Sequence, residues 1–360
     1  MSGLSREMII HPGETLKEVL SDRGMPQQEL AARTGVTPKH ISTVLSGEKS
    51  ITVSFAKKLE YALNIDAEFW INLQNAYDKE LLEFEEVNSI SEQELSIAKH
   101  LKDVFTYLVQ KKLVSACSLM EQKVLELRKF LNVSNLTAIP SLVNFGAFRA
   151  QTSVSIDEYT LFAWMRICEV LAEDIEVEML EFALQKRAVL DSIEDLKSLM
   201  FAKPAVFIQE LQNRLAKSGV AFCIAPSFKG TPVQGFIKNA PSGKIILCLT
   251  FRQKRADIFW FSFFHELGHF VNGDSRQRFI DFESVETLRE QKADVFAQNH
   301  LINKDEYERF LSKKDFSLRA IRQFSATQKV LPCILIGRLK KEKYLQWSDY
   351  PEENVMYESC

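Results

Sequence analysis

The sequence predicts a mainly α-helical protein with one small β-sheet, in the α+β class, and three observations support this prediction. Helix caps and turn residues alternate at short intervals between positions 10 and 75. Apolar residues then recur at three- and four-residue spacing from about 95 to 215. Three short runs of β-branched and aromatic residues follow, before the helical spacing returns. We therefore expect three segments, which cover residues 1–77, 78–200 and 201–360.

Composition and charge limit the classes of protein to consider. With 360 residues, 46% hydrophobic and 26% charged, the chain is long enough for two or three domains that each bury a core. The net charge of -3 is close to neutral, so any contact with nucleic acid must depend on a local arrangement of side chains. The six cysteines are spaced singly, without a C-x-x-C pair, and we interpret them as reduced core thiols.

The expected location is the cytoplasm, without a membrane anchor. The first residues, MSGLSREMIIHPGE, lack the apolar core of a secretion signal. The apolar run at 258–264 is much too short to span a bilayer.

The N-terminal segment has the layout of a helix-turn-helix, in residues 27–35 and 37–47. Gly35 would form the turn, Val36 would plug the angle between the helices and Thr37 would cap the second helix. The predicted inner faces consist of Leu30, Ala31, Ile41, Val44 and Leu45. The predicted outer face consists of Pro38, Lys39, His40, Ser42 and Thr43.

This outer face predicts DNA binding. Lys39 and Thr43 are placed to reach base edges, and Gln27, His40 and Ser46 are placed to anchor phosphates on either side. The alternative is a helical domain used only for dimerisation, which the local charge favours because residues 1–70 hold eight Lys/Arg against nine Asp/Glu. We expect a homodimer that binds paired half-sites of a DNA operator.

The middle segment is predicted to be helical. Residues 78–98 are rich in acidic side chains, which is typical of a solvated helix or linker. The apolar spacing that follows favours a helical packing layer over a ligand pocket. The runs VAFCIAP, VQGFIKN and KIILCLTF are then expected to form three strands of a small sheet.

A metal site is predicted directly after the sheet, in the run His-Glu-Leu-Gly-His. In a helix, positions i and i+4 share one face, so His265 and His269 would both direct an imidazole at one ion, with Glu266 beside them. The apolar run before the motif indicates a buried helix, in which two histidines are costly unless a metal or hydrogen bonds satisfy them. We expect Zn²⁺, with Glu266 as the proton carrier of a hydrolytic reaction.

The third ligand is expected on a second helix. Glu290 is the predicted ligand, and Asp294, one turn later, is placed to accept the second N–H of a ligating histidine. Ala293, Phe296 and Ala297 would give this helix a small apolar face for packing. Glu283 and Glu286 remain alternatives to Glu290, because the helix register is uncertain.

Two parts of the chain resemble known families. The runs HPGETLKEVL, ELAARTGV and ISTVLSG resemble HigA-type antitoxins of the Cro/C1 repressor class, over about the first 78 residues. The runs FSFFHELGHFVNGD, EQKADVFAQNHLI and VLPCILIGRL resemble ImmA/IrrE-family metallopeptidases, over roughly 200–345. The second resemblance implies a zincin-like domain with a small sheet packed on helices. It also implies zinc on His265, His269 and Glu290, with Glu266 as the catalytic acid/base, and cleavage of repressor proteins.

We therefore expect a DNA-binding regulator with a zinc-dependent endopeptidase domain that cleaves itself or a partner repressor or toxin. The alternative is an antitoxin or repressor whose zinc domain senses or holds a partner without turnover. A hydrolase of small substrates is a third hypothesis, which a deep pocket would favour.

Overall fold

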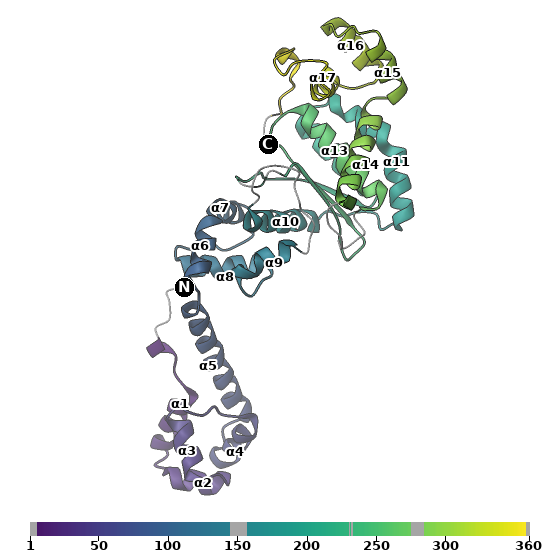
Figure 1. The fold of residues 1–360 in the computed structure, drawn as a ribbon. Helices are drawn as coiled ribbons and strands as arrows, with labels where there is room; N and C mark the ends of the chain where they lie inside the picture. The colour runs from purple at the N-terminus through teal and green to yellow at the C-terminus, as the bar shows by residue number, and fades with distance from the viewer. Residues whose placement is uncertain (1–5, 145–156, 230, 232, 275–283, 358–360) are drawn as a thin grey trace. The chain divides into compact units, whose positions relative to one another are not determined.

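The computed structural model describes residues 6–144, 157–229, 231, 233–274 and 284–357 (Figure 1). These residues form two compact units. One contains the chain up to Ser96 together with Cys117–Leu125, and the other contains Ile97–Ala116 and the chain from Glu126 onward. Mainly helical structure with one small sheet confirms the predicted fold class. Among the described helices, none has the length and apolar character needed to cross a membrane.

In the first unit, four of the described helices begin after a side chain that caps the helix N-terminus. A short 3-10 turn, η1, is followed by helices that begin after His11, Thr37, Thr52 and Asp66, each of which accepts a backbone N–H. The elements are η1 (Arg6–Met8), α1 (Pro12–Asp22), α2 (Gln27–Thr34), α3 (Pro38–Leu45), α4 (Val53–Leu63), α5 (Ala67–Asn88) and α6 (Glu92–His100), which ends in the second unit.

The helix-turn-helix prediction is confirmed by α2 and α3. Gly35 ends α2 in the left-handed conformation, with φ 63°, and Thr37 accepts the N–H of His40 as the cap of α3. The predicted inner residues are buried in a single core, to which Phe55 of α4 and Trp70 of α5 also contribute. Burial of these side chains fixes the angle between α2 and α3 and leaves the other face of α3 toward solvent.

The boundary expected at residue 77 falls within α5, which continues to Asn88. The acidic segment that follows position 77 is therefore helical at first, as one of the two alternatives for it predicted. Its charged side chains do not interrupt the helix, because the sequence between Asp66 and Ser89 contains neither Pro nor Gly.

The second unit contains the sheet. Its helices before the sheet are α7 (Lys102–Gln110), α8 (Met120–Leu131), which begins in the first unit, α9 (Ile139–Asn144), α10 (Glu158–Glu173), α11 (Phe182–Ser198) and α12 (Pro204–Ala216), with 3-10 turns η2 (Leu136–Ala138) and η3 (Leu199–Phe201). After the sheet come α13 (Ala256–Asn272), α14 (Ser284–Leu301), α15 (Lys304–Ser312), α16 (Leu318–Thr327), α17 (Pro332–Lys341) and η5 (Pro351–Glu353).

The three strands lie where the sequence predicts them, as β1 (Val220–Ala225), β2 (Gly235–Asn239) and β3 (Ile245–Thr250). Their order is β1-β3-β2, with β1 parallel and β2 antiparallel to β3. Alternate side chains of β1 and β3, such as Phe222 and Leu247, join the core that α13 also enters. The opposite face of these strands is covered by α10, so β1 and β3 are buried on both faces.

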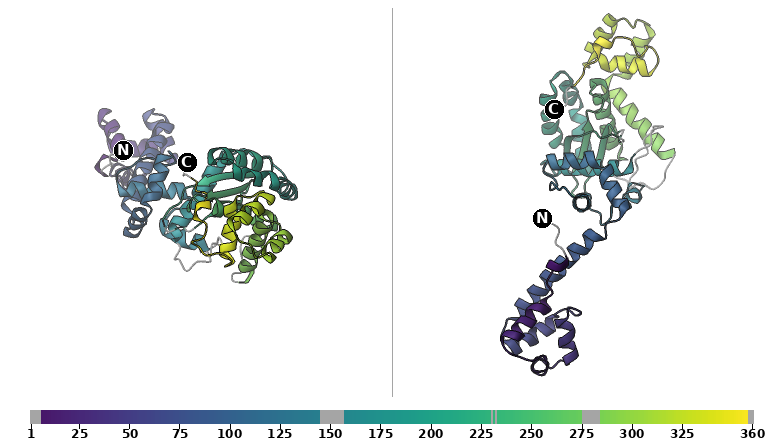
Figure 2. Two further views of the ribbon diagram at one scale, coloured as in Figure 1. Left: turned by 90° about the horizontal axis from the view of Figure 1, so that it is seen from above. Right: turned by 90° about the vertical axis from the view of Figure 1, so that its left-hand side faces the viewer.

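The sheet and the following helices position the candidate site. Among the elements in the described part of the chain, α13 and α14 share the most extensive contact, and they lie side by side in Figure 1. The last α-helix, α17, packs against α13 and α16. In both views of Figure 2, the yellow-green and yellow C-terminal helices lie together. The sheet, α14 and α17 therefore each contact α13, which carries the metal motif.

Candidate metal centre and nucleic-acid interface

The metal motif lies on α13, a helix that is apolar on most of its surface. Phe263, Phe264, Leu267 and Phe270 are buried and fix the rotation of the helix about its axis. The side chains of His265 and His269 then share one face, 16% and 14% exposed. Their ring centroids lie 4.7 Å apart, as expected for positions one turn apart.

Gly268 allows α14 to approach this face. A Cβ atom at position 268 would lie 3.0 Å from the Cα of Ala293 and 3.1 Å from the Cβ of Phe296. Ala293 and Ala297 are fully buried, so small side chains line both sides of the contact, as the sequence predicts for α14. The need for glycine at 268 was not predicted, although its place between the two histidines was a visible signal.

The structure brings His265, His269 and Glu290 together. Their ligand atoms all lie within 4.8 Å of one another. The Nε2 atoms of the two histidines are 3.1 Å apart, and they lie 3.1 and 3.3 Å from the two carboxylate oxygens of Glu290. Two imidazole nitrogens and one carboxylate are the donor set of a catalytic zinc site. The residues present therefore fit the ion predicted from the sequence.

In each of the two imidazoles, the Nδ1 atom lies next to the carboxylate of an aspartate. Nδ1 of His265 lies 2.9 Å from Oδ1 of Asp294, the contact expected from the sequence. Nδ1 of His269 lies 3.1 Å from Oδ2 of Asp274, which was not predicted. Both contacts favour the tautomer in which Nδ1 donates its proton and Nε2 presents a lone pair.

The charges of the site are strongly coupled. Burial opposes the charged form of His265, but Asp294 and Glu290 outweigh it and raise its pKa to about 9. In the same way, burial is outweighed by Asp274 and Glu290, which raise the pKa of His269 to about 10. Burial would raise the pKa of Glu290, but the two histidines lower it to about 2. The two histidines and Glu290 therefore form one electrostatically coupled group.

Glu266 differs from the three converging residues. Burial raises its pKa, and the positive histidines only partly offset this effect. The side chain lies against the start of β2, where a Cβ atom at Gly235 would lie 2.6 Å from the Cγ of Glu266. Only glycine leaves room there, which is a second close approach that the sequence pattern did not reveal.

Two predicted alternatives cannot be placed. Glu283 and the side chain of Glu286 lie outside the described part of the chain. The remaining histidines have other partners. His11 accepts the N–H of Gly13 as the cap of α1, and His100 pairs with Asp157.

The predicted DNA-contacting residues lie on or next to α2 and α3. Gln27, Pro38, Lys39 and Ser46 are exposed, whereas His40 and Thr43 are half-buried. The His40 ring packs edge-on against Phe55, with centroids 4.9 Å apart.

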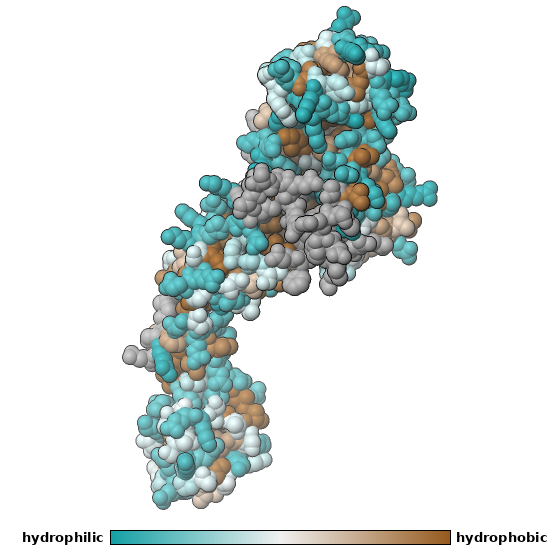
Figure 3. All heavy atoms as spheres, in the orientation of Figure 1, coloured by the Kyte–Doolittle hydropathy of each residue, from teal (hydrophilic) through white to brown (hydrophobic). Residues whose placement is uncertain are grey.

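The hydroxyl of Thr43 donates to the carbonyl of His40, at 2.9 Å. On the face shown in Figure 3, the N-terminal helices present mostly hydrophilic side chains. Lys39 is thus the most accessible of the residues predicted to reach bases.

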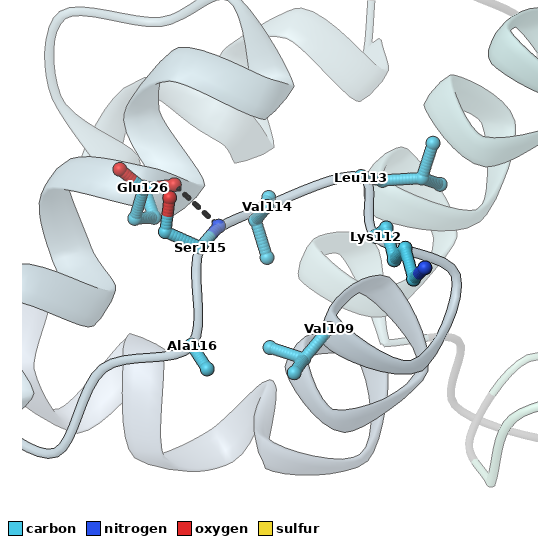
Figure 4. A pocket seen from close by; sticks show the side chains of 7 residues that line it. All are labelled: Val109, Lys112, Leu113, Val114, Ser115, Ala116 and Glu126. Carbon is cyan, nitrogen blue, oxygen red and sulfur yellow. Dashed lines mark hydrogen bonds between the residues drawn. The ribbon is translucent and has the colours of Figure 1, made fainter.

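One cavity in the second unit surrounds the segment that follows α7. It has a volume of about 410 Å³ and is lined by Val109, residues 112–116 and Glu126 (Figure 4). The N–H of Ser115 donates to Glu126 across 2.9 Å at its edge. None of the predicted site residues lines this cavity, so it gives no support to hydrolysis of a small substrate at the metal centre.

Comparisons with known proteins match the N-terminal unit. A helix-turn-helix family model matches residues 16–70. Virulence-associated protein I of Dichelobacter nodosus is 34% identical over 83 residues, which is 23% of this chain and 77% of that protein. The uncharacterized helix-turn-helix transcriptional regulator YddM of Escherichia coli K12 is 30% identical over 66 residues, which is 18% of this chain and 70% of that protein.

A solved structure is also similar. It is an addiction module antidote protein of a HigA family from Coxiella burnetii, 28% identical, with a TM-score of 0.19 over 30% of this chain and 97% of that one. The sequence matches and the observed α2–α3 geometry agree on the N-terminal unit. Through this unit, the chain belongs to the family of DNA-binding helix-turn-helix proteins that includes virulence-associated protein I and YddM.

Proposed function

We propose that this protein is a transcriptional regulator that binds zinc in its second unit and hydrolyses a peptide bond there, in itself or in a partner repressor or toxin. The observation that carries the proposal is the convergence of both Nε2 atoms with the Glu290 carboxylate, within 4.8 Å. Similarity to ImmA/IrrE-family metallopeptidases, in the runs around His265 and Glu290, supports the same assignment.

Each residue of the site has a role that its surroundings support. His265, His269 and Glu290 would hold zinc, which when bound supplies Lewis acidity to the scissile carbonyl. Glu266 would take a proton from the attacking water and pass it to the departing amine nitrogen. Burial raises the pKa of Glu266, which makes this carboxylate a better proton acceptor than an exposed glutamate.

The DNA-binding half would direct this activity to a control region. Lys39 and Thr43 would contact bases, and Gln27, His40 and Ser46 would contact phosphates. Because one helix-turn-helix covers a single half-site, binding as a homodimer to half-sites about 34 Å apart would provide the affinity that one copy lacks. Cleavage of the regulator or of its partner would then end repression.

The test compares Glu266→Gln with Lys39→Ala, in purified protein and in cells that carry an operator reporter. Glu266→Gln should keep zinc and DNA binding but abolish cleavage, seen as loss of the product masses, because it removes only the proton carrier. Lys39→Ala should keep cleavage and weaken DNA binding about 10-fold to 100-fold, as expected for the loss of a base contact worth about 1–3 kcal/mol.

Glu308→Gln, an exposed change on α15, serves as the matched control and should behave as the wild type. Normal regulation by Glu266→Gln in cells would contradict the protease switch. That result would leave an antitoxin-like repressor whose zinc domain binds a partner without turnover.

A further inference from the structure

We infer that Asp274 positions His269 for metal binding and that Arg289 holds Asp274 in place. This inference rests on the proposed zinc site and adds two residues to it. It starts from the end of α13, where Gly273 adopts φ 84° and turns the chain back toward the last helical turn. Asp274 follows directly, and its Oδ2 reaches Nδ1 of His269 at 3.1 Å.

The second oxygen of Asp274 faces a cation. Oδ1 of Asp274 lies 3.6 Å from Nε of Arg289, and the two side chains are 14% and 19% exposed. Such a half-buried pair is screened less by solvent than a surface ion pair. Arg289 immediately precedes Glu290 on α14, so one helix supplies both a metal ligand and the residue that holds the support of another ligand.

His265 has an equivalent arrangement, which argues against a chance contact at Asp274. Its Nδ1 faces Asp294, whose other oxygen lies 3.5 Å from Nζ of Lys341 on α17. Each imidazole therefore contacts a carboxylate, and the other oxygen of that carboxylate lies near a cationic side chain. The cation on the Asp274 side is the more enclosed, because the side chain of Lys341 is 62% exposed.

The chemistry of imidazole explains what these residues contribute. A neutral histidine binds metal through Nε2 only when the proton is on Nδ1 and the ring plane points at the ion. A carboxylate that accepts the Nδ1 proton fixes both properties and makes Nε2 a stronger donor, and loss of such a support typically lowers metal affinity about 10-fold to 100-fold.

The experiment measures the zinc affinity of the full chain by competition with a chromophoric chelator, and the visible spectrum of the cobalt(II) form. Asp274→Ala should weaken zinc binding about 10-fold to 100-fold and change the cobalt spectrum. Asp274→Asn keeps an acceptor oxygen of the same size and should lose less. Asp174→Asn, an exposed aspartate at the end of α10, is the matched control and should bind as the wild type.

A double-mutant cycle tests the role of Arg289. Arg289→Ala should weaken zinc binding in the wild type but add little in the Asp274→Ala background, because it acts through Asp274. Full additivity would overturn that role, and unchanged affinity in Asp274→Ala would overturn the whole inference while the zinc site stands. If the wild type binds no zinc after metal-replete preparation, the proposed site fails and this inference fails with it. Thermal unfolding of the metal-free variants identifies a loss that reflects misfolding, which Asp274→Asn should avoid.

Discussion

The helix pairs α2–α3 and α13–α14 have similar local structure but place their polar side chains differently. The pair α2–α3 has them on its outer face, and α13–α14 has them at the contact between its two helices. In each pair the first helix ends at a glycine in the left-handed conformation, Gly35 at φ 63° and Gly273 at φ 84°. The first pair buries its apolar side chains between the helices and exposes Lys39 on the outer face. The second pair directs His265 and Glu290 toward each other.

The surroundings of each pair explain this difference. One face of α3 packs on the core and the other is free, so polar side chains remain where a large ligand such as DNA can reach them. In contrast, α13 is packed by the sheet, α14 and α17, and its polar residues must find partners within the protein. The comparison shows that a polar residue in an apolar helix is the stronger indication of chemistry, because its burial requires compensation.

The largest expected effect is the loss of metal from one pair without damage to the other. His265→Ala and Glu290→Ala should each reduce zinc from about one ion per chain to an undetectable amount, because three protein ligands are the minimum of a catalytic site. DNA binding should persist, since the core of α1–α5 is separate. Elemental analysis and a DNA mobility shift measure the two properties, with His40→Ala as the control that keeps zinc. Zinc retained by Glu290→Ala would assign the ligand role to another carboxylate.

The next effect is on the pH dependence of zinc affinity. The pKa values of about 9 and 10 for His265 and His269 mean that zinc must displace two protons at neutral pH. Affinity should therefore rise with pH below about 9, with a limiting slope of about 100-fold per unit. Chelator competition at several pH values between 6 and 9 gives this slope.

The stability of the metal-free protein should change with pH in the direction opposite to the zinc affinity. Folded-state pKa values above the ordinary value of 6.5 stabilise the fold below pH 6.5, and this contribution is lost as the pH rises through 9 to 10. Thermal unfolding of the metal-free protein should therefore occur at lower temperature toward pH 10.

Zinc affinity that does not change between pH 6.5 and 9 would contradict both pH predictions, because it would show that the histidines are neutral in the metal-free protein.

The smallest effect distinguishes the glycines of the two pairs. Gly268→Ala should destabilise the second unit by about 1–3 kcal/mol, because the methyl group meets the backbone of Ala293 across a packed interface. Gly35→Ala meets no atom within 4 Å and should cost only the strain of its backbone, about 1–2 kcal/mol. Denaturant unfolding measures both. Zinc binding should weaken in Gly268→Ala alone, and equal affinities in the two variants would mean that helix spacing does not control the site.

Local rules were enough to predict much of both regions. The cap at Thr37, the turn at Gly35 and the three- and four-residue spacing of buried residues define α2 and α3 within one stretch of chain. The i, i+4 spacing of His265 and His269 likewise depends only on the helical period. The positions of Asp274 and Gly235 beside the site, and the packing of His40 on Phe55, depend on how separate elements pack. No periodicity within one segment reports such contacts, so these residues were missed or were expected to be more exposed.

The order of the two units along the chain has a consequence for biosynthesis. The core of α1–α5 lies within residues 16–70, whereas the site of α13 and α14 is complete only after Glu290. At a synthesis rate of about 5–20 residues per second, a nascent chain would have a folded helix-turn-helix roughly ten seconds or more before Glu290 is added. We therefore expect protease protection of the first unit on stalled ribosomes before the second has formed. A young copy of this protein would then be able to engage DNA while its second unit is still being made.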